Sequence, residues 1–533
     1  MKKRLILLCV FITAVLVMLH VVSGKEKLYS EICLTYEEAQ ELVSSRVHAQ
    51  ETLFETIYFN EYELFADVLG NRLFYSLIEG SDSAYNPVVE CDSTRPDVEI
   101  AIVGSAITDE VIANGEMFGI LLYTDTEYQY MNLAFTTLPM LSADFEGLLE
   151  LAPDYLPIEF KLFDNREDAA QRIISADGKM HIRGRTSRFY PKRGFRFSLF
   201  TESPGQNKRE LKTSLLGMRQ DGDWLLYAAY NDASKIRNVL SSNLWHESCA
   251  TDNVCGVDNG MEYRYVELFM NDQYWGLYAL GYPIDSLQLQ MTEGEYMYEK
   301  EDPYVSEYDI DFTASGDVYG YSIRELGDNE DPSWEPLKEY YQAMIYADDN
   351  YESLREWTDI NNAIDIYLFI NLIQGVDQAN LRGENIIFNL YMTNKIYDDG
   401  ESEVMLYAPW DMDRTWGRAY EDDVDPRAIT VEENVLMQTN LVHFLLEQGD
   451  EEMQKMVTER YWQLRESTWS DEHLIDMVTL YETQIFDSGA YVRDQLRWPD
   501  GSYRDVNDKL GYFKDYIAER TTYMDMYVEN IAK

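Results

Sequence analysis

The sequence predicts an α+β protein in which strands come first and helices last. Short runs of alternating apolar and polar residues, separated by turn residues, fill residues 58–143 and return between residues 157 and 280, and this period of two is typical of strands. Residues 431–533 instead carry apolar side chains spaced by three and four, which indicates helices. The 533 residues allow two to four domains, and a hydrophobic content of 46% suffices for a large core.

The N-terminus has the pattern of an export signal. A basic tripeptide at residues 2–4 precedes an apolar run over residues 5–22, and small residues follow at 23–24, where a signal peptidase could cleave. The apolar run is long for a signal peptide, so an uncleaved membrane anchor is the alternative for residues 1–24. Both interpretations predict an exported chain that is secreted, held at the cell surface, or anchored to a membrane only through this segment.

The chain is strongly acidic, with a formal net charge of −52. Such a charge repels the phosphate backbone of nucleic acids, so we expect no DNA or RNA partner. It attracts divalent cations or basic substrates, although an acidic exterior that only keeps the protein in solution explains the same charge. Composition therefore argues against nucleic acids as partners and leaves the function open.

Four cysteines lie beyond the export signal, and an even number in an exported chain allows two disulfides. Cys249 and Cys255 flank a short loop and are the predicted local pair. Cys33 and Cys91 would then close the N-terminal region. The spacing of these cysteines is not that of a metal site.

Residues 25–137 are predicted to form an N-terminal helix followed by a β module. Residues 35–56 have acids early and helical apolar spacing. From residue 58 the alternating stretches indicate a small antiparallel, sandwich-like module. The sequence Thr-Leu-Pro at residues 137–139 marks the boundary to the rest of the chain. We expect a spacer or a binding module, because no pattern in this region indicates chemistry.

Residues 179–200 are predicted to form two strands around a basic loop, which is unusual in so acidic a chain. The basic residues are Arg183, Arg185, Arg188, Lys192, Arg193 and Arg196. Arginine forks bind phosphate oxygens in pairs and a lysine supplies a point charge, so this cluster fits a triphosphate. Pro191 fixes the backbone directly before Lys192, which favours a placed lysine. The alternative is a surface hairpin that neutralises acidic neighbours.

The following segment predicts a strand, a polar turn and an amphipathic helix over residues 222–247, and then a hairpin over residues 265–280. Asp232 in the polar turn could cap the helix or act in catalysis, and we favour capping. Both strands of the hairpin are rich in apolar and aromatic residues, as a central sheet requires.

Two carboxylates follow a predicted buried strand near residue 407. Asp411 and Asp413 lie between Trp410 and Trp416 in the sequence Tyr-Ala-Pro-Trp-Asp-Met-Asp-Arg-Thr-Trp-Gly. On an extended backbone, alternate side chains share a face roughly 6.5–7 Å apart. Such carboxylates repel each other unless a cation or a proton lies between them, and a hard divalent metal is the simplest partner. A solvated turn in an acidic protein is the alternative.

A polar loop comes shortly before this strand. A largely apolar helix over residues 359–373 runs into a loop that contains Asp377 and Asn385, and a strand follows. Helix, Asp/Asn loop, strand, turn and strand ending in Asp is the layout of the phosphoryl-transfer core of protein kinases. The usual His-Arg-Asp and Asp-Phe-Gly sequences are absent. A helix-to-strand loop without chemistry is therefore the alternative.

Together these segments resemble the CotH family of secreted or spore-coat proteins, which are atypical, kinase-like proteins. The matching blocks are residues 182–197, 223–245, 265–280, 376–391 and 407–417. The resemblance implies a distorted protein-kinase-like fold over residues 138–533, with an antiparallel β-rich lobe and a helical lobe. It also implies that the protein binds ATP and magnesium and transfers the γ-phosphate to Ser or Thr hydroxyls of a protein substrate.

The same resemblance implies roles for individual residues. Lys192 would be the phosphate-binding strand lysine, and Arg183 and Arg185 would be further phosphate contacts. Asp377 would be the catalytic-loop aspartate. The metal ligands would be Asn385, Asp411 and Asp413, and which of the two aspartates contacts the metal directly stays open.

One position departs from the family pattern. Tyr282 stands where the family usually has the glutamate of a Leu-x-Glu-x-Ile-Asp pattern, and Asp285 and Glu299 are the nearby acidic substitutes. A catalytically silent kinase-fold protein that binds or builds a cell surface or spore coat is therefore the second hypothesis. A metal-dependent hydrolase on the same carboxylates gains little support, because the 6 histidines are scattered.

Overall fold

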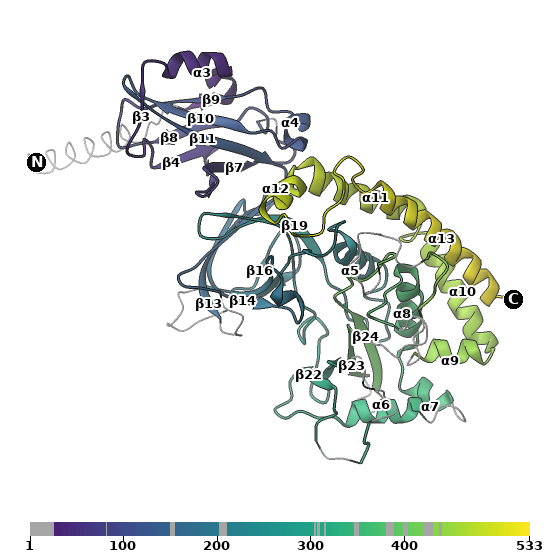
Figure 1. The fold of residues 1–533 in the computed structure, drawn as a ribbon. Coiled ribbons are helices and arrows are strands. Elements are labelled where there is room, and N and C mark those ends of the chain that lie inside the picture. The colour runs from purple at the N-terminus through teal and green to yellow at the C-terminus, as the bar shows by residue number, and fades with distance from the viewer. Residues whose placement is uncertain are drawn as a thin grey trace, which may run out of the picture.

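The computed structural model describes residues 26–81, 83–149, 155–201, 210–302, 305, 310–313, 316–345, 351–379, 389–397, 403–418, 430–435 and 440–533 (Figure 1). Strands and helices are mixed in this part of the chain, which confirms the predicted α+β class. The predicted export signal at residues 1–24 and Asn385 lie outside the described residues. Within those residues, no helix combines the length and the apolar character that crossing a bilayer requires.

The N-terminal region packs two sheets around one core. One sheet has the strand order β1-β8-β4-β5, and the other has the order β2-β9-β10-β11-β7-β6 with β3 beside β11. Their shared core includes the fully buried Phe59, Ile102, Ile120 and Leu133, so the arrangement is sandwich-like. The strands are β1 (Lys27–Leu28), β2 (Cys33–Leu34), β3 (Val47–His48), β4 (Thr56–Phe59), β5 (Tyr62–Glu63), β6 (Phe65–Asp67), β7 (Arg72–Ser76), β8 (Val88–Asp92), β9 (Glu99–Val103), β10 (Phe118–Tyr123) and β11 (Glu127–Thr136). The helices of this region are α2 (Tyr29–Ile32), α3 (Tyr36–Val43) and α4 (Asp109–Ala113).

Two details of this region differ from the prediction. The module is not purely antiparallel, because β11 pairs with β7 and β2 pairs with β9 in parallel. The helix predicted over residues 35–56 ends at Val43, although it begins as predicted, with Thr35 and Glu38 forming a capping box. Beyond it, residues 47–48 pair with β11. Strand pairing with an existing sheet overrides the local helical pattern there.

A closed sheet lies below the N-terminal region and beside the helices in the view of Figure 1. Its strand order is β12-β13-β14-β15-β18-β20-β19, and parallel pairing of β12 with β19 closes it. The two predicted hairpins are confirmed as the antiparallel pairs β14/β15 and β19/β20. Met180, Phe197, Trp224 and Leu280 belong to its apolar core. The strands are β12 (Met140–Asp144), β13 (Leu156–Phe163), β14 (Ile173–Arg183), β15 (Gly194–Phe200), β18 (Asp223–Tyr227), β19 (Tyr263–Phe269) and β20 (Tyr274–Gly281).

Another sheet, here called the second sheet, has the strand order β22-β21-β23-β24 and is separate from the two sheets of the N-terminal region. It packs against helix α8. The side chain of Asn362 on α8 brackets one residue of β24: its Nδ2 donates to the carbonyl oxygen of Tyr407 at 3.0 Å, and its Oδ1 accepts the Tyr407 N–H at 2.8 Å. Asn362 thereby fixes the strand that leads to Asp411. The strands are β21 (Met297–Lys300), β22 (Tyr321–Glu325), β23 (Leu390–Ile396) and β24 (Glu403–Pro409).

Helices α9 to α13 form an arc along one side of the molecule (Figure 1). They share a core with α5 and α8 that contains Trp245, Phe369, Leu441, Tyr461 and Ile517. The helical C-terminal region is thus confirmed. Its apolar spacing predicts helices over residues 436–451, 452–466, 471–487 and 505–531, and α12 lies outside these four. The helices are α5 (Arg237–Ser248), α6 (Glu335–Ile345), α7 (Tyr351–Glu356), α8 (Ile360–Ile373), α9 (Leu441–Glu447), α10 (Glu451–Arg465), α11 (Asp471–Glu482), α12 (Ala490–Arg497) and α13 (Gly511–Ile531).

The structure contains neither predicted disulfide, although all four of those cysteines belong to the described residues. The Cys33 thiol lies 3.4 Å from the carbonyl oxygen of Gly104, and Cys249 is buried in the helical core. Nearness in sequence does not provide the Cβ geometry that a disulfide needs. The prediction of two disulfides is therefore wrong for this structure.

The division of the chain at residue 137 stays a prediction. Apolar contacts cross this position, since Phe74 of β7 stacks on Tyr274 of β20 with ring centroids 5.2 Å apart. Met140 and Phe269 belong to the same small cluster. The N-terminal region therefore packs directly on the closed sheet.

Candidate active site

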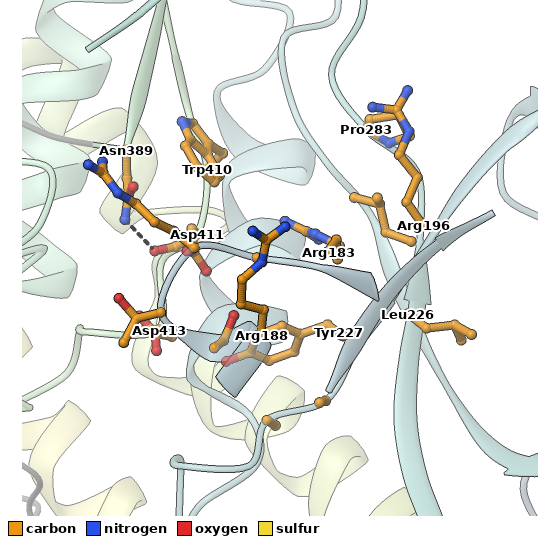
Figure 2. Close-up of a pocket in the computed structure, with 18 of the residues that line it drawn as sticks. Arg183, Arg188, Arg196, Leu226, Tyr227, Pro283, Asn389, Trp410, Asp411 and Asp413 are labelled. Atoms are coloured by element: carbon orange, nitrogen blue, oxygen red, sulfur yellow. Dashed lines mark hydrogen bonds between the residues drawn. The ribbon is translucent and has the colours of Figure 1, made fainter. Parts of the chain in front are cut away.

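A cavity of about 690 Å³ lies where the closed sheet meets the second sheet and the loop after α8 (Figure 2). One wall consists of the end of β14, the basic loop and β18, and the other consists of residues from β23, from the loop after α8 and from the segment after β24. Arg183, Arg185, Asp377, Asp411 and Asp413 all line it. The structure therefore brings the early basic hairpin and the late aspartates together.

The segment at residues 410–418, here called the acidic loop, holds Asp411 in a left-handed conformation with φ of +50°. Aspartate tolerates this region better than most residues. Gln378 donates to the carbonyl oxygen of Trp410 at 3.0 Å, and Asn389 donates to that of Asp411 at 3.2 Å. These bonds fix the turn, and Figure 2 shows Asp411 beside Asn389 at the cavity.

Two side chains of helix α5 bond to the backbone of the acidic loop. Asn238 accepts the N–H of Met412 at 2.8 Å, and the Arg237 guanidinium donates to the carbonyl oxygen of Thr415 at 3.0 Å. Arg237 is itself held by the fully buried Asp232 at 2.6 Å. Asp232 also accepts the backbone N–H of Arg237, the first residue of α5. Ile236, not Asp232, is the N-cap residue of α5, so the capping favoured above does not hold in its usual form. Asp232 contacts the start of the helix through the Arg237 N–H and acts on the loop through the Arg237 guanidinium.

Asp377 reaches the cavity because two loops pair with each other. Gln374 ends α8 in a left-handed conformation, and the chain then turns alongside the acidic loop. The backbone N–H of Trp416 donates to the carbonyl oxygen of Ile373 at 2.6 Å. The guanidinium of Arg414 lies 3.7 Å from the Asp377 carboxylate. Residues 374–379 and 410–418 therefore form one unit that presents three carboxylates to the cavity.

Two of these carboxylates are weak acids. Burial and the charge of Asp413, against the opposing effect of Arg414, together raise the pKa of Asp377 to about 7. Burial also raises the pKa of Asp411 to about 7, again with Asp413 adding to the effect and Arg183 opposing it. A cation between the carboxylates would remove the repulsion that contributes to both shifts.

The residues present fit a divalent cation. The Oδ1 atom of Asn389 is buried and has no hydrogen-bond partner among the described residues, and amide oxygens are ligands that hard cations accept. Asn389, Asp411 and Asp413 line the same part of the cavity. Within the described residues, no group of three or more His, Cys, Asp or Glu side chains could hold a metal by itself. An amide oxygen and oxygens from a bound ligand would complete the coordination.

Lys192 is among the residues that line the cavity, but its side chain is buried. Its ammonium is fully buried, 2.8 Å from the Asp494 carboxylate of α12 and 2.6 Å from the carbonyl oxygen of Leu277. The ring of Tyr278 covers it at 4.7 Å. Nucleotide binding by Lys192 stays a prediction, and this enclosed position does not favour it.

Tyr282, the departure from the family pattern, is buried in the core of the closed sheet under the guanidinium of Arg219. Of the two acidic substitutes, Asp285 pairs with Arg219 at 3.3 Å, whereas Glu299 lines the cavity. Glu299 therefore supplies an acidic side chain to the cavity from β21, later in the chain than Tyr282, where the family pattern places its glutamate.

Several cavity residues were not singled out from the sequence. Asn389 lies four positions beyond the predicted Asn385, and its place in the same block was a signal. Arg414 lies inside the acidic motif and pairs with Asp377. The Tyr227 hydroxyl is buried in the cavity wall without a hydrogen-bond partner among the described residues, and no sequence signal marked it.

The fold and the site define a class of protein: an α+β protein whose cavity sets an arginine-rich wall against carboxylates suited to a cation. Residues 180–524, more than half of the chain, match the sequence model of a family described as CotH kinase protein. The chain belongs to the CotH family. It is 23% identical over 242 residues to the inner spore coat protein H of Bacillus subtilis (strain 168). That match covers 44% of this chain and 58% of the spore coat protein, so the chain spans less than two thirds of this relative.

Proposed function

We propose that this chain is an exported protein kinase of a distorted kinase-like fold, which transfers the γ-phosphate of ATP to Ser or Thr hydroxyls of a protein substrate with magnesium. The observation that carries the proposal is the cavity in which Asp377, Asp411 and Asp413 face an arginine-rich wall. Phosphoryl transfer needs little covalent help from the protein and depends on positioning and charge stabilisation. This cavity offers both.

The three carboxylates have two different roles in this proposal. Asp411 and Asp413, with Asn389, would hold magnesium, which when bound neutralises the charge of the phosphates. Asp377 accepts the proton of the acceptor hydroxyl. Its pKa of about 7 suits a general base that works near neutral pH. Arg414 orients the Asp377 carboxylate from 3.7 Å.

The site of action is proposed to lie outside the cytoplasm, at a cell surface or a spore coat. The basic and apolar pattern at residues 1–24 supports export. The similarity to an inner spore coat protein supports the spore surface as one such place. The protein substrate would be another exported protein with exposed hydroxyls.

The test is phosphate transfer by purified residues 25–533 with labelled ATP, magnesium, and either casein or the chain itself as acceptor. We expect transfer by the wild type and a decrease of about 10²–10⁴-fold in Asp377→Ala, because a positioned general base contributes that much. Asp476→Asn, at an exposed position on α11, is the matched control and should be as active as the wild type. Equal transfer by the wild type and Asp377→Ala contradicts the proposal.

A catalytically silent binding protein of the same fold is the second candidate. Two observations favour it: Tyr282 replaces the acidic residue of the family pattern, and the Lys192 ammonium is already paired with Asp494. Thermal unfolding with and without ATP and magnesium separates the two candidates. A kinase is stabilised by its nucleotide, whereas a binding protein that has lost the nucleotide site shows no shift.

A further inference from the structure

We infer that Arg183 and Arg188, rather than Lys192, hold the phosphates of the ligand, and that Lys192 is a structural cation that joins the closed sheet to helix α12. This inference deepens the proposed function and rests on it for the identity of the ligand as a polyphosphate. Of the phosphate contacts that the resemblance implies, the inference keeps Arg183, adds Arg188, and removes Lys192 and Arg185.

The position of Lys192 leaves its ammonium no room for a ligand. The Lys192 and Asp494 side chains both have an exposed fraction of 0%. Asp494 also accepts the N–H of Leu277 at 3.0 Å and the hydroxyl of Tyr503 at 2.9 Å. A phosphate could reach the Lys192 ammonium only if this set of bonds opened and left Asp494 buried without its cation, which is unfavourable.

Most arginines of the cavity also have partners. Arg196 lies 2.9 Å from Asp223, Arg324 lies 3.0 Å from Glu299, and Arg414 lies 3.7 Å from Asp377. Arg185 donates to the carbonyl oxygen of Glu301. These contacts neutralise or occupy the guanidinium groups concerned, so they are poor candidates for the main anion contacts.

Arg183 and Arg188 differ from the other arginines of the cavity. Neither forms an ion pair with a carboxylate of the described residues, and the Nε of Arg188 is buried there without a hydrogen-bond partner. Figure 2 shows both side chains on the wall that faces Asp411 and Asp413. Two guanidinium groups that form no direct ion pair with the described residues, opposite a candidate metal site, are the arrangement that a metal-bound polyphosphate would fill, because guanidinium forks match phosphate oxygens.

The backbone fixes both arginines. Arg183 is the last residue of β14 and pairs with Gly194, where a Cβ would lie only 3.2 Å from the carbonyl oxygen of Leu226 and 3.4 Å from Cγ of Arg183. A larger residue at position 194 would crowd the Arg183 side chain, and glycine leaves room for it. Arg188 lies in the single 3₁₀ turn η1 (Ser187–Phe189). Gly184, three residues before this turn, has φ of +104°, a conformation that favours glycine.

The test measures the binding of inorganic tripolyphosphate to the full chain by calorimetry at physiological ionic strength, with magnesium and without nucleotide. We expect Arg183→Gln and Arg188→Gln each to weaken binding about tenfold or more, as the loss of a charge-assisted hydrogen bond does. The double variant Lys192→Met, Asp494→Asn should bind within about twofold of the wild type, since it removes both charges of the pair together. Arg95→Gln, in the N-terminal region, is the matched control.

A second measurement covers the case in which the double variant does not fold. Phenylglyoxal labelling of the wild type, read by mass spectrometry, should show Arg183 and Arg188 protected by tripolyphosphate and Arg95 unprotected. Wild type that does not bind tripolyphosphate, or labelling at Arg183 and Arg188 that tripolyphosphate does not change, overturns the inference. Tripolyphosphate binding through these arginines without phosphate transfer to protein would overturn the kinase proposal and leave this inference standing.

Discussion

The buried carboxylates of the scaffold and the carboxylates of the cavity have opposite surroundings. Asp232 is fully buried, yet Arg237 lies 2.6 Å away and Ser234 donates both its N–H and its hydroxyl. Burial alone would raise the pKa of Asp232, but these partners lower it below its usual value. In the cavity, burial and mutual repulsion raise the pKa of Asp377 and of Asp411 to about 7.

The difference shows which acids serve the fold and which serve a ligand. Glu267 and Asp494, like Asp232, each have a buried cation within hydrogen-bonding distance. The chain can therefore neutralise buried acids where packing requires it. In the cavity, Arg414 lies 3.7 Å from Asp377 and Arg418 lies 3.4 Å from Asp413, yet the pKa values of Asp377 and Asp411 stay raised. Perturbed carboxylates gathered in a cleft are typical of functional sites.

The largest expected effect comes from breaking a scaffold pair. Asp232→Ala leaves the Arg237 guanidinium buried without its carboxylate, and we expect the free energy of unfolding to fall by about 3–5 kcal/mol. In Asp411→Asn, the side chain that is replaced forms no ion pair among the described residues and asparagine tolerates the left-handed backbone, so we expect a change below about 1 kcal/mol. Urea unfolding followed by circular dichroism measures both.

An equal loss of stability in the two variants would contradict the distinction between scaffold and cavity acids. Asp476→Asn, exposed on α11, is the control for removing one negative charge from so acidic a chain. It should unfold at the same urea concentration as the wild type.

The sequence predicted the parts of the site that are carried by local motifs. Asp411 and Asp413 follow a buried strand, and Arg183 ends a strand of a hairpin, so their placement required only strand periodicity. The opposition of the two motifs across one cavity followed from the order of the blocks. These residues are the ones that the structure brings together.

The parts that sequence could not predict depend on distant partners. Lys192 is enclosed because Asp494 arrives on α12, a helix that the periodicity did not reveal. Asn389 rather than another loop asparagine bonds to the acidic loop because β23 begins directly after it. Helix α3 is short because residues 47–48 pair with β11. In each case tertiary contacts decide between locally acceptable alternatives.

A smaller effect should follow from cation binding. Magnesium at about one hundred times its dissociation constant stabilises a native protein by about 2.7 kcal/mol if it binds one site of the folded state only. We expect a matching rise in the unfolding temperature of the wild type and no rise in Asp413→Asn beyond that of sodium chloride at equal ionic strength. The chloride control is needed because a net charge of −52 attracts any cation. A full magnesium shift in Asp413→Asn would place the cation elsewhere.

The smallest effect is a pH dependence that separates the cavity from the scaffold. The folded-state pKa of Asp411 is about 7 and that of an unfolded aspartate is about 3.9, so the native state binds more protons between these values. Its contribution therefore makes the metal-free protein less stable as the pH rises toward 7 and stops changing above about 8. Between pH 8 and pH 6 one such group changes the free energy of unfolding by about 1.4 kcal/mol.

The variant Asp411→Asn, in which asparagine tolerates the left-handed backbone, tests this. Its free energy of unfolding should change between pH 8 and pH 6 by less than that of the wild type, by at least this amount, because the variant removes one titrating group and also lowers the pKa of Asp377. The same slope in Asp411→Asn and in the wild type would mean that the cavity acids titrate like exposed aspartates, and the contrast with Asp232 would then lose its physical basis.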